Sequence, residues 1–379
     1  MSAARNTRQI KFLGTMPAEF TPDPRSAMLW VAEHTPAEQA GTVAMVCDVN
    51  QQWVVELLAA YADRPGLTVL RSGRFSDYED FTAYDVAPGH TLTPADVAMN
   101  RQDEIRERLT IWRELRATLP GWEDVPLQVS QPHPLDLAMF TFAPRTVAKG
   151  LPAWPLLRHF PDVTRALRHL PVFEKAVADE MNELAAEFGN DLVWNVESPV
   201  GTLAVVRGQS FGMAGLFGRM IGGLLARGIE PMPLTGRLDL HLCYGDYRHR
   251  ELRAPRNLRA AVALLNPITE RLLRTRGSLP VVHIPAAYGH HDAPLDPAFY
   301  RPLGELHPAW RVVAGVVSGV SGPEHSLRAL ERFEDGLGAT TVGVGTACGL
   351  GRTPSDDVER IMRTQVVAAQ ADLAHVVMR

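Results

Sequence analysis

Short apolar runs alternate with longer amphipathic segments along almost the whole chain, and this alternation limits the possible folds more than any other feature. The runs are rich in Val, Leu and Ile, and several are apolar on both faces, as is typical of parallel strands that helices cover on both sides. Eight runs are predicted to be strands: Gln9–Leu13, Val43–Val49, Pro126–Ser130, Leu192–Val196, Leu238–Cys243, Pro280–Ile284, Val312–Ser318 and Thr341–Gly345. The predicted helices between them are Ser26–Glu33, Gln51–Tyr61, Pro94–Leu119, Val163–Phe188, Met213–Arg227, Leu252–Arg276, Pro323–Leu337 and Pro354–Val377.

Eight strands that alternate with helices predict a (β/α)8 barrel. We therefore expect an α/β protein in which residues 1–379 form a single TIM barrel with loop insertions on the C-terminal face. Two long connections that contain Pro or Gly, Arg71–Thr93 and Ala143–Phe160, are expected to be loops over that face. The alternative is a doubly wound open sheet, but no Gly-x-Gly-x-x-Gly follows the first strand, which disfavours its dinucleotide-binding version.

Composition excludes several classes of protein. The chain has 38 Lys and Arg against 43 Asp and Glu, and no basic block, so nucleic acid is not an expected partner. The 46% share of hydrophobic residues supports a large core and argues against disorder. No apolar run is long enough to cross a membrane, and the first residues carry no apolar signal core. With only three cysteines, a disulfide framework is not expected, and we predict a cytoplasmic protein whose assembly as a homo-oligomer stays open.

Two histidine and cysteine motifs lie where the site of such a barrel is expected, at the C-terminal ends of strands. His241 and Cys243 are two residues apart on one predicted strand, so their side chains share a face. Cys348 follows the last predicted strand. Imidazole and thiolate groups suit Zn²⁺, and three protein ligands leave one tetrahedral position open for a substrate. The alternative is structural, with both cysteines packed as small apolar groups and the histidine hydrogen bonded in the core.

A zinc ion at these residues has one obvious task. Zinc lowers the pKa of a coordinated thiol so strongly that the thiol loses its proton, and the resulting thiolate attacks an electrophilic carbon. Hydrolysis by zinc-bound water is the generic alternative. Two thiolate ligands make the metal a weak Lewis acid, which favours activation of a thiol over activation of water.

Three segments resemble motifs of a known family. Residues 13–17, Leu-Gly-Thr-Met-Pro, resemble its Ile-Gly-Ser-Phe-Pro opening, and residues 241–247, His-Leu-Cys-Tyr-Gly-Asp-Tyr, resemble its His-x-Cys-Tyr zinc motif. Residues 347–352, Ala-Cys-Gly-Leu-Gly-Arg, resemble its Asp-Cys-Gly-Leu-Lys zinc motif. The family is the catalytic, C-terminal half of cobalamin-independent methionine synthase, within the uroporphyrinogen-decarboxylase-like barrel superfamily. The resemblance spans most of the chain and implies zinc at His241, Cys243 and Cys348.

Weaker matches imply residues that bind the substrate. Asp48 stands at the family's Gly-Glu, and Glu197 stands at its Ile-Asp-Glu-Pro, where carboxylates contact the amine of the substrate amino acid. The resemblance thus implies that these two residues orient the acceptor, although each is also placed to cap a following helix. Thr15 in the opening motif and His133, in a loose echo of the family's Gly-Pro-Val-Thr segment, are the other implied substrate-binding residues.

The chain departs from the family at two catalytic positions. Pro285 stands where the family has a glutamate zinc ligand, and His283, two residues earlier on the same face, is a candidate fourth ligand. Residues 315–321, Gly-Val-Val-Ser-Gly-Val-Ser, replace the segment that carries the family's catalytic histidine. We therefore assign no catalytic residue beyond the metal ligands.

The first expectation for function is a zinc-dependent transferase that joins a small-molecule thiol to an alkyl group, above all a methyl group, from a donor. An alternative, from the same superfamily, resembles epoxyalkane:coenzyme M transferase, in which a thiolate opens an epoxide. The sulfonate of coenzyme M then needs an arginine, and the candidates are Arg71, Arg74, Arg145 and Arg352. A second alternative is a non-catalytic zinc barrel or the partner of a corrinoid protein.

Overall fold

The centre of the molecule is a parallel sheet. A computed structural model describes residues 8–44, 52–76, 80–148, 153–246 and 249–371. The sheet has the strand order β1-β10-β9-β8-β7-β6-β5-β2. Its strands are β1 (Gln9–Lys11), β2 (Val43–Ala44), β5 (Leu127–Pro132), β6 (Leu192–Glu197), β7 (Arg237–His241), β8 (Val281–Pro285), β9 (Val312–Val317) and β10 (Gly343–Thr346). Each strand begins within two residues of the start of a predicted strand, so these strand positions are confirmed.

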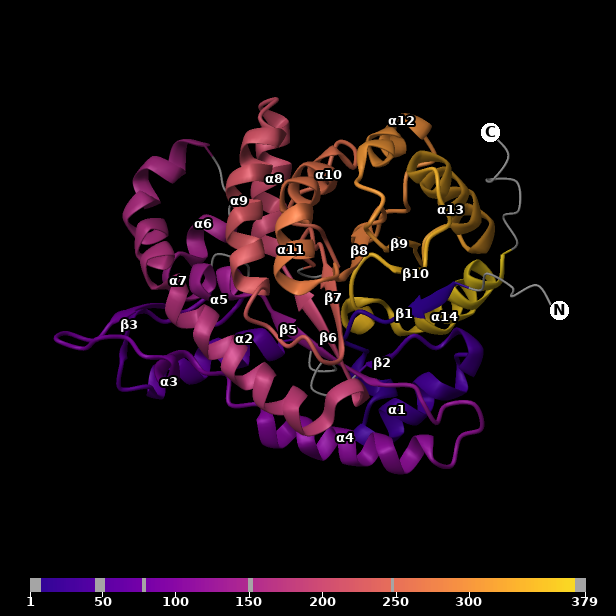
Figure 1. The fold of residues 1–379 in the computed structure, drawn as a ribbon, viewed down its shortest axis with the longest axis horizontal. Helices are drawn as coiled ribbons and strands as arrows, with labels where there is room; N and C mark the ends of the chain where they lie inside the picture. The colour runs from indigo at the N-terminus through magenta and orange to yellow at the C-terminus, as the bar shows by residue number, and fades with distance from the viewer. Residues whose placement is uncertain (1–7, 45–51, 77–79, 149–152, 247–248, 372–379) are drawn as a thin grey trace.

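Helices surround the sheet, as Figure 1 shows, with α8, α9 and α10 together above the strands and α4 along the lower edge. They are α1 (Pro24–Glu33), α2 (Trp53–Ala59), α3 (Pro94–Val97), α4 (Gln102–Arg116), α5 (Pro134–Phe142), α6 (Pro144–Ala148), α7 (Ala153–Phe188), α8 (Pro199–Ser210), α9 (Ala214–Ile229), α10 (Arg259–Leu265), α11 (Thr269–Arg276), α12 (Pro297–Tyr300), α13 (Pro323–Leu337) and α14 (Ser355–Gln370). Several begin with Pro, whose fixed φ and missing N–H suit the first helical turn. In the part of the chain that the structure describes, none of the helices has the length and apolar character needed to span a membrane.

The sheet is curled, but the closed eight-stranded barrel is confirmed only in part. Every ladder in the sheet is parallel, and the strands follow barrel order. Among the described residues, however, no ladder joins β1 to β2, and one isolated parallel bridge between Ile10 and Ala40 lies across that seam. Only Val43 and Ala44 of the predicted strand Val43–Val49 lie in β2, because residues 45–49 are outside the described residues.

Both expected loops contain regular structure. The connection Arg71–Thr93 includes β4 (Ala83–Val86), which pairs with β3 (Leu67–Arg71) as an antiparallel hairpin that extends to the left edge of Figure 1. The connection Ala143–Phe160 includes α6 and the first turns of α7. Pro161 lies inside α7 and lacks the N–H that a helix uses, which is why the sequence predicts a later start. The helix continues through it because α7 packs along α5.

A buried ion pair fills the sheet interior beneath the ends of the strands. The Nζ of Lys11 on β1 lies 2.5 Å from Oδ2 of Asp239 on β7, and it also donates to Gln128 on β5. The Lys11 and Asp239 side chains are 4% and 1% exposed. Burial lowers the pKa of Lys11 to about 8, although the charge of Asp239 opposes this shift. Asp239 shares its strand face with His241, two residues further on, so the ion pair lies below the next layer of side chains.

Candidate metal centre

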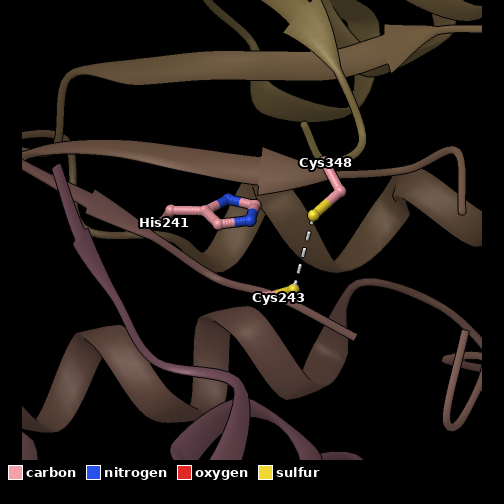
Figure 2. Close-up of side chains that lie close together, drawn as sticks. All are labelled: His241, Cys243 and Cys348. Atoms are coloured by element: carbon pink, nitrogen blue, oxygen red, sulfur yellow. Dashed lines mark hydrogen bonds between the residues drawn. The ribbon is translucent and has the colours of Figure 1, made fainter. Parts of the chain in front are cut away.

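Three ligand atoms from two strand ends converge at the mouth of the sheet. His241 is the last residue of β7, Cys243 follows two residues later, and Cys348 comes two residues after β10. Figure 2 shows the imidazole of His241 and the two sulfur atoms turned toward one another. One ligand atom from each residue lies within 4.8 Å of the other two, and the Sγ atoms are 3.9 Å apart. The described residues contain no other such group of three His, Cys, Asp or Glu side chains.

The geometry and chemistry of these three groups fit a zinc ion. Two sulfur atoms that each lie 2.3 Å from zinc at the tetrahedral angle are about 3.8 Å apart, which matches the observed Sγ–Sγ distance of 3.9 Å. His241 is 1% exposed and Cys243 is 8% exposed. The Nε2 atom of His241 is buried and has no hydrogen-bond partner among the described groups. A buried nitrogen without a partner is unfavourable, and a metal ion at this position would satisfy it.

The two thiols share one hydrogen bond, and this bond separates their proton affinities. It lowers the pKa of Cys243 well below its usual value, and the His241 imidazole and the Gly245 N–H, 3.3 Å from the sulfur, act in the same direction against the effect of burial. The same hydrogen bond raises the pKa of Cys348 well above its usual value. Without metal, the pair therefore holds its negative charge on Cys243 and a proton on Cys348. Metal ligation by both sulfur atoms requires release of that proton.

His283 contacts the metal group through His241. The two histidines are register partners on the neighbouring strands β7 and β8, and their Nδ1 atoms are 2.8 Å apart. The set of mutually close ligand atoms does not include His283.

Two cavities meet at Cys348. Cavity A is lined by Thr15, Glu197 and Cys243 among others, and also by Arg352. Cavity B lies toward β9 and α14 and is lined by groups such as His249, His290, Ser318 and Asp357. Asp246, Cys348 and Gly349 line both cavities. Cys348 therefore lies between the two cavities.

The substrate-binding residues implied by the sequence lie in different places. Thr15 and Glu197 line cavity A, and Glu197 ends β6 at the mouth of the sheet. Asp48 lies outside the described residues. His133 lines neither cavity; its Nδ1 accepts a hydrogen bond from the Leu135 N–H as the cap of α5, and its Nε2 lies 3.0 Å from the carbonyl oxygen of Leu225.

Of the four candidate arginines, Arg352 is at the metal group. It lines cavity A beside Cys348 and reaches Asp246 at 3.5 Å. Arg71 instead donates to the carbonyl oxygen of Phe81, at 2.7 Å, on the β3–β4 hairpin. Burial raises the pKa of Asp246 to about 7, and the charge of Arg352 opposes that shift.

Several residues of the site were not predicted. Asp246 lies three residues after Cys243 inside the zinc motif, and this position was the available signal. His249 adopts a φ of 59°, and its Nδ1 lies 4.0 Å from Oδ1 of Asp246. Its sequence neighbourhood carries no comparable signal.

An aromatic wall of cavity A also has no local sequence signal. Phe75 and Phe81 lie on the connection between β3 and β4, whereas Phe140 lies on α5. Their ring centroids are 4.6 Å apart for Phe75 and Phe81, and 5.1 Å apart for Phe81 and Phe140. Only the packing of the hairpin against α5 brings these rings to the cavity.

Comparisons with known proteins show a shared fold. No family model and no curated protein sequence matches the chain. Among solved structures, a B12-independent methionine synthase from Shewanella sp. W3-18-1, in complex with selenomethionine, is similar with a TM-score of 0.55 and 12% sequence identity, over 96% of this chain and 97% of that chain. A methyltransferase from Methanosarcina mazei has a TM-score of 0.49 and 12% identity, over 96% and 93% of the two chains. At these identities the likeness to the Shewanella structure establishes the fold alone.

Proposed function

We propose that the protein is a zinc-dependent transferase that activates a small-molecule thiol and transfers an alkyl group, specifically a methyl group, to its sulfur. The observation that carries this proposal is the convergence of His241 Nε2 with the sulfur atoms of Cys243 and Cys348 beside two cavities. The fold shared with the Shewanella methionine synthase supports the same reaction class.

In this proposal, His241, Cys243 and Cys348 hold the metal and leave one coordination position open. When bound, Zn²⁺ supplies the charge that lets a substrate thiol lose its proton at neutral pH. The acceptor thiol enters through cavity A, and the alkyl donor approaches through cavity B. The new S–C bond forms while the bond from the same carbon to the leaving group of the donor breaks, and the proton of the thiol passes to solvent. The protein contributes mainly positioning of the two reactants.

The residues of cavity A orient the acceptor. In this proposal Glu197 binds an ammonium group of the acceptor, with Asp48 as its partner, and Thr15 supplies a hydroxyl group; Glu197 and Thr15 both line cavity A. The backbone N–H of His133 donates to the backbone carbonyl oxygen of Glu197 at 2.9 Å, so we propose that His133 supports the strand end rather than contacting the acceptor. Because β5 and β6 are joined there, this bond holds the end of β6 in place.

One observation favours a second candidate, the addition of a thiol to an epoxide. Arg352 lines cavity A, and its guanidinium group suits an acceptor that carries a sulfonate or carboxylate. The thiolate then opens the ring, and the alkoxide takes up a proton. The mass of the product distinguishes the two reactions, because addition retains all atoms of the electrophile whereas transfer releases a leaving group.

The first experiment is the zinc content of the purified protein and of the variants His241→Ala, Cys243→Ser and Cys348→Ser, with Cys47→Ser as the matched cysteine control. We expect about one zinc per chain in the wild type and the control, and loss of zinc from the other three. The zinc-loaded protein is then incubated with amino-acid and sulfonate thiols and with methyl donors or epoxides, and products are identified by mass spectrometry. A folded wild type that takes up no added zinc would refute the proposal. Full zinc occupancy without any thiol product would instead favour a non-catalytic barrel.

A further inference from the structure

His241 and His283 form a buried pair of imidazoles at the metal group. Each residue is 1% exposed, and the ring centroids are 4.9 Å apart with planes inclined by 44°. Their Nδ1 atoms are 2.8 Å apart. A hydrogen bond between two imidazole nitrogens needs an N–H on one and a lone pair on the other. One Nδ1 atom of this pair must therefore carry the proton while the other accepts it.

The direction of this hydrogen bond decides whether His241 binds a metal. If His241 Nδ1 carries the proton, its Nε2 has a free lone pair for a metal ion; among the described groups, the Nε2 atoms of both His241 and His283 are buried without a hydrogen-bond partner. If His283 donates instead, a neutral His241 carries its proton on Nε2 and cannot act as a ligand through that atom. His283 is 1% exposed, and burial disfavours a charged imidazole, so a neutral His283 ring has one lone pair with which to accept this proton.

We propose that His283 is a positioning residue that accepts the Nδ1 proton of His241 and thereby holds His241 in its metal-binding tautomer. This inference rests on the proposed zinc site and adds a role for His283 other than that of a fourth ligand. Ligating histidines generally donate their second N–H to a carboxylate, a carbonyl or water. Here the acceptor is a neutral imidazole.

A neutral acceptor has a consequence for charge. Two thiolates and a neutral imidazole around Zn²⁺ sum to zero, whereas a carboxylate behind His241 would add a negative charge. A site that stays neutral repels an incoming substrate thiolate less. His283 thus fixes the tautomer without lowering the affinity of the site for the proposed acceptor.

The fold keeps space for His283 by means of Gly315 on the next strand, β9. A Cβ atom at position 315 would lie 2.5 Å from His283 Nε2 and 2.8 Å from Cα of Pro285. The ring is therefore held between β9 on its Nε2 side and His241 on its Nδ1 side. This confinement explains how a ring that binds no substrate keeps one orientation.

The test uses zinc alone as the probe, measured by competition with a chromophoric chelator. His283→Leu removes the acceptor, whereas His283→Asn restores it, because Oδ1 of asparagine is attached to Cγ as Nδ1 is in histidine. We expect His283→Leu to bind zinc 10- to 100-fold more weakly than the wild type, and His283→Asn to recover part of the loss. His325→Leu is the control, because it removes an imidazole that lines neither cavity and whose Nε2 lies 2.8 Å from the Ala293 carbonyl oxygen; its zinc affinity should stay within twofold of the wild type.

A second measurement needs no substitution. Long-range ¹H–¹⁵N correlation spectra of the histidine-labelled, zinc-loaded wild type report which ring nitrogen of each histidine carries a proton, and we expect His241 Nδ1 and His283 Nε2. Three outcomes would each overturn the inference. They are an unchanged zinc affinity in His283→Leu, an equal loss of zinc affinity in His283→Asn and His283→Leu, and a proton on His283 Nδ1. A wild type that binds no zinc would overturn the proposed function as well, so the two failures are distinguishable.

Discussion

Substitution of Gly315 by alanine should damage both the stability of the protein and its zinc site. The added Cβ would meet His283 Nε2 at 2.5 Å and Pro285 Cα at 2.8 Å, whereas ordinary contacts between such atoms are about 3.5 Å or longer. The overlap is therefore about 1 Å with the His283 ring and about 0.7 Å with Pro285. The ring cannot retreat without disturbing the hydrogen bond to His241, which is already 2.8 Å long, and the other contact is backbone. Overpacking of this kind costs about 1–3 kcal/mol.

The assays are urea unfolding, which reports the free energy of unfolding, and chelator competition, which reports zinc affinity. We expect Gly315→Ala to lose about 2 kcal/mol of stability and at least tenfold in zinc affinity. Gly223→Ala on α9 is the matched control, because a Cβ there meets nothing within 4 Å and alanine favours a helix by about 1 kcal/mol. Combining Gly315→Ala with His283→Ala should cost at least about 1 kcal/mol less than the sum of the two single changes, because the ring is then absent. Unchanged stability and zinc affinity in Gly315→Ala would refute this account of the packing.

Three further predictions follow from buried groups. The pKa of Cys243 lies well below its usual value in the metal-free protein. Alkylation of Cys243 by iodoacetamide, followed by mass spectrometry, should therefore stay fast from pH 9 down to pH 7 and stop when zinc is added. A tenfold fall in the alkylation rate per pH unit would contradict this. Lys11→Met leaves Asp239 buried with Arg237 as its one cationic partner among the described residues. We expect this change to lower the free energy of unfolding in urea by about 3 kcal/mol, and a change below about 1 kcal/mol would show that the ion pair contributes little. Gly218→Ala would drive a Cβ atom into a carbonyl oxygen of α10. Because neither backbone can yield, we expect a larger fall in the free energy of unfolding than for Gly315→Ala. Equal stability of Gly218→Ala and the wild type in thermal unfolding would contradict the tight packing of α9 on α10.

Much of the architecture could be predicted because its signals are local. An apolar run between a Gly and a helical segment identifies a buried strand wherever it occurs, and the strands from Gln9 to Thr346 begin where the pattern indicates. Helices α5 and α8 and the break between α10 and α11 were not predicted, and two further misassigned positions involve competing local signals. Pro161 ends a helix in most settings, and the runs around Leu67–Arg71 and Ala83–Val86 are short and polar enough to look like a loop. In both cases, contacts with α5 outweigh the local preference.

The ligand group could be proposed from the sequence for a similar reason. The spacing of His241 and Cys243 places both side chains on one face of any strand, and parallel strands that end at the same edge bring Cys348 near them. Whether the three atoms approach within ligand distance is a property of the tertiary structure, since it depends on how strongly the sheet curls between β7 and β10.

The sequence by itself therefore determined the strand positions and the residue types that meet at the sheet edge. Side-chain alternation is a property of each strand alone, and all strands of a parallel sheet end at the same edge. Only the tertiary structure decided that Asp246 and Cys348 separate two cavities, that Phe75 and Phe140 share one wall, and that His283 contacts His241. Each of these depends on the spacing and curl of neighbouring strands and on helix packing. Those quantities are set by contacts between residues far apart in the chain, for which a single sequence carries no periodic signal.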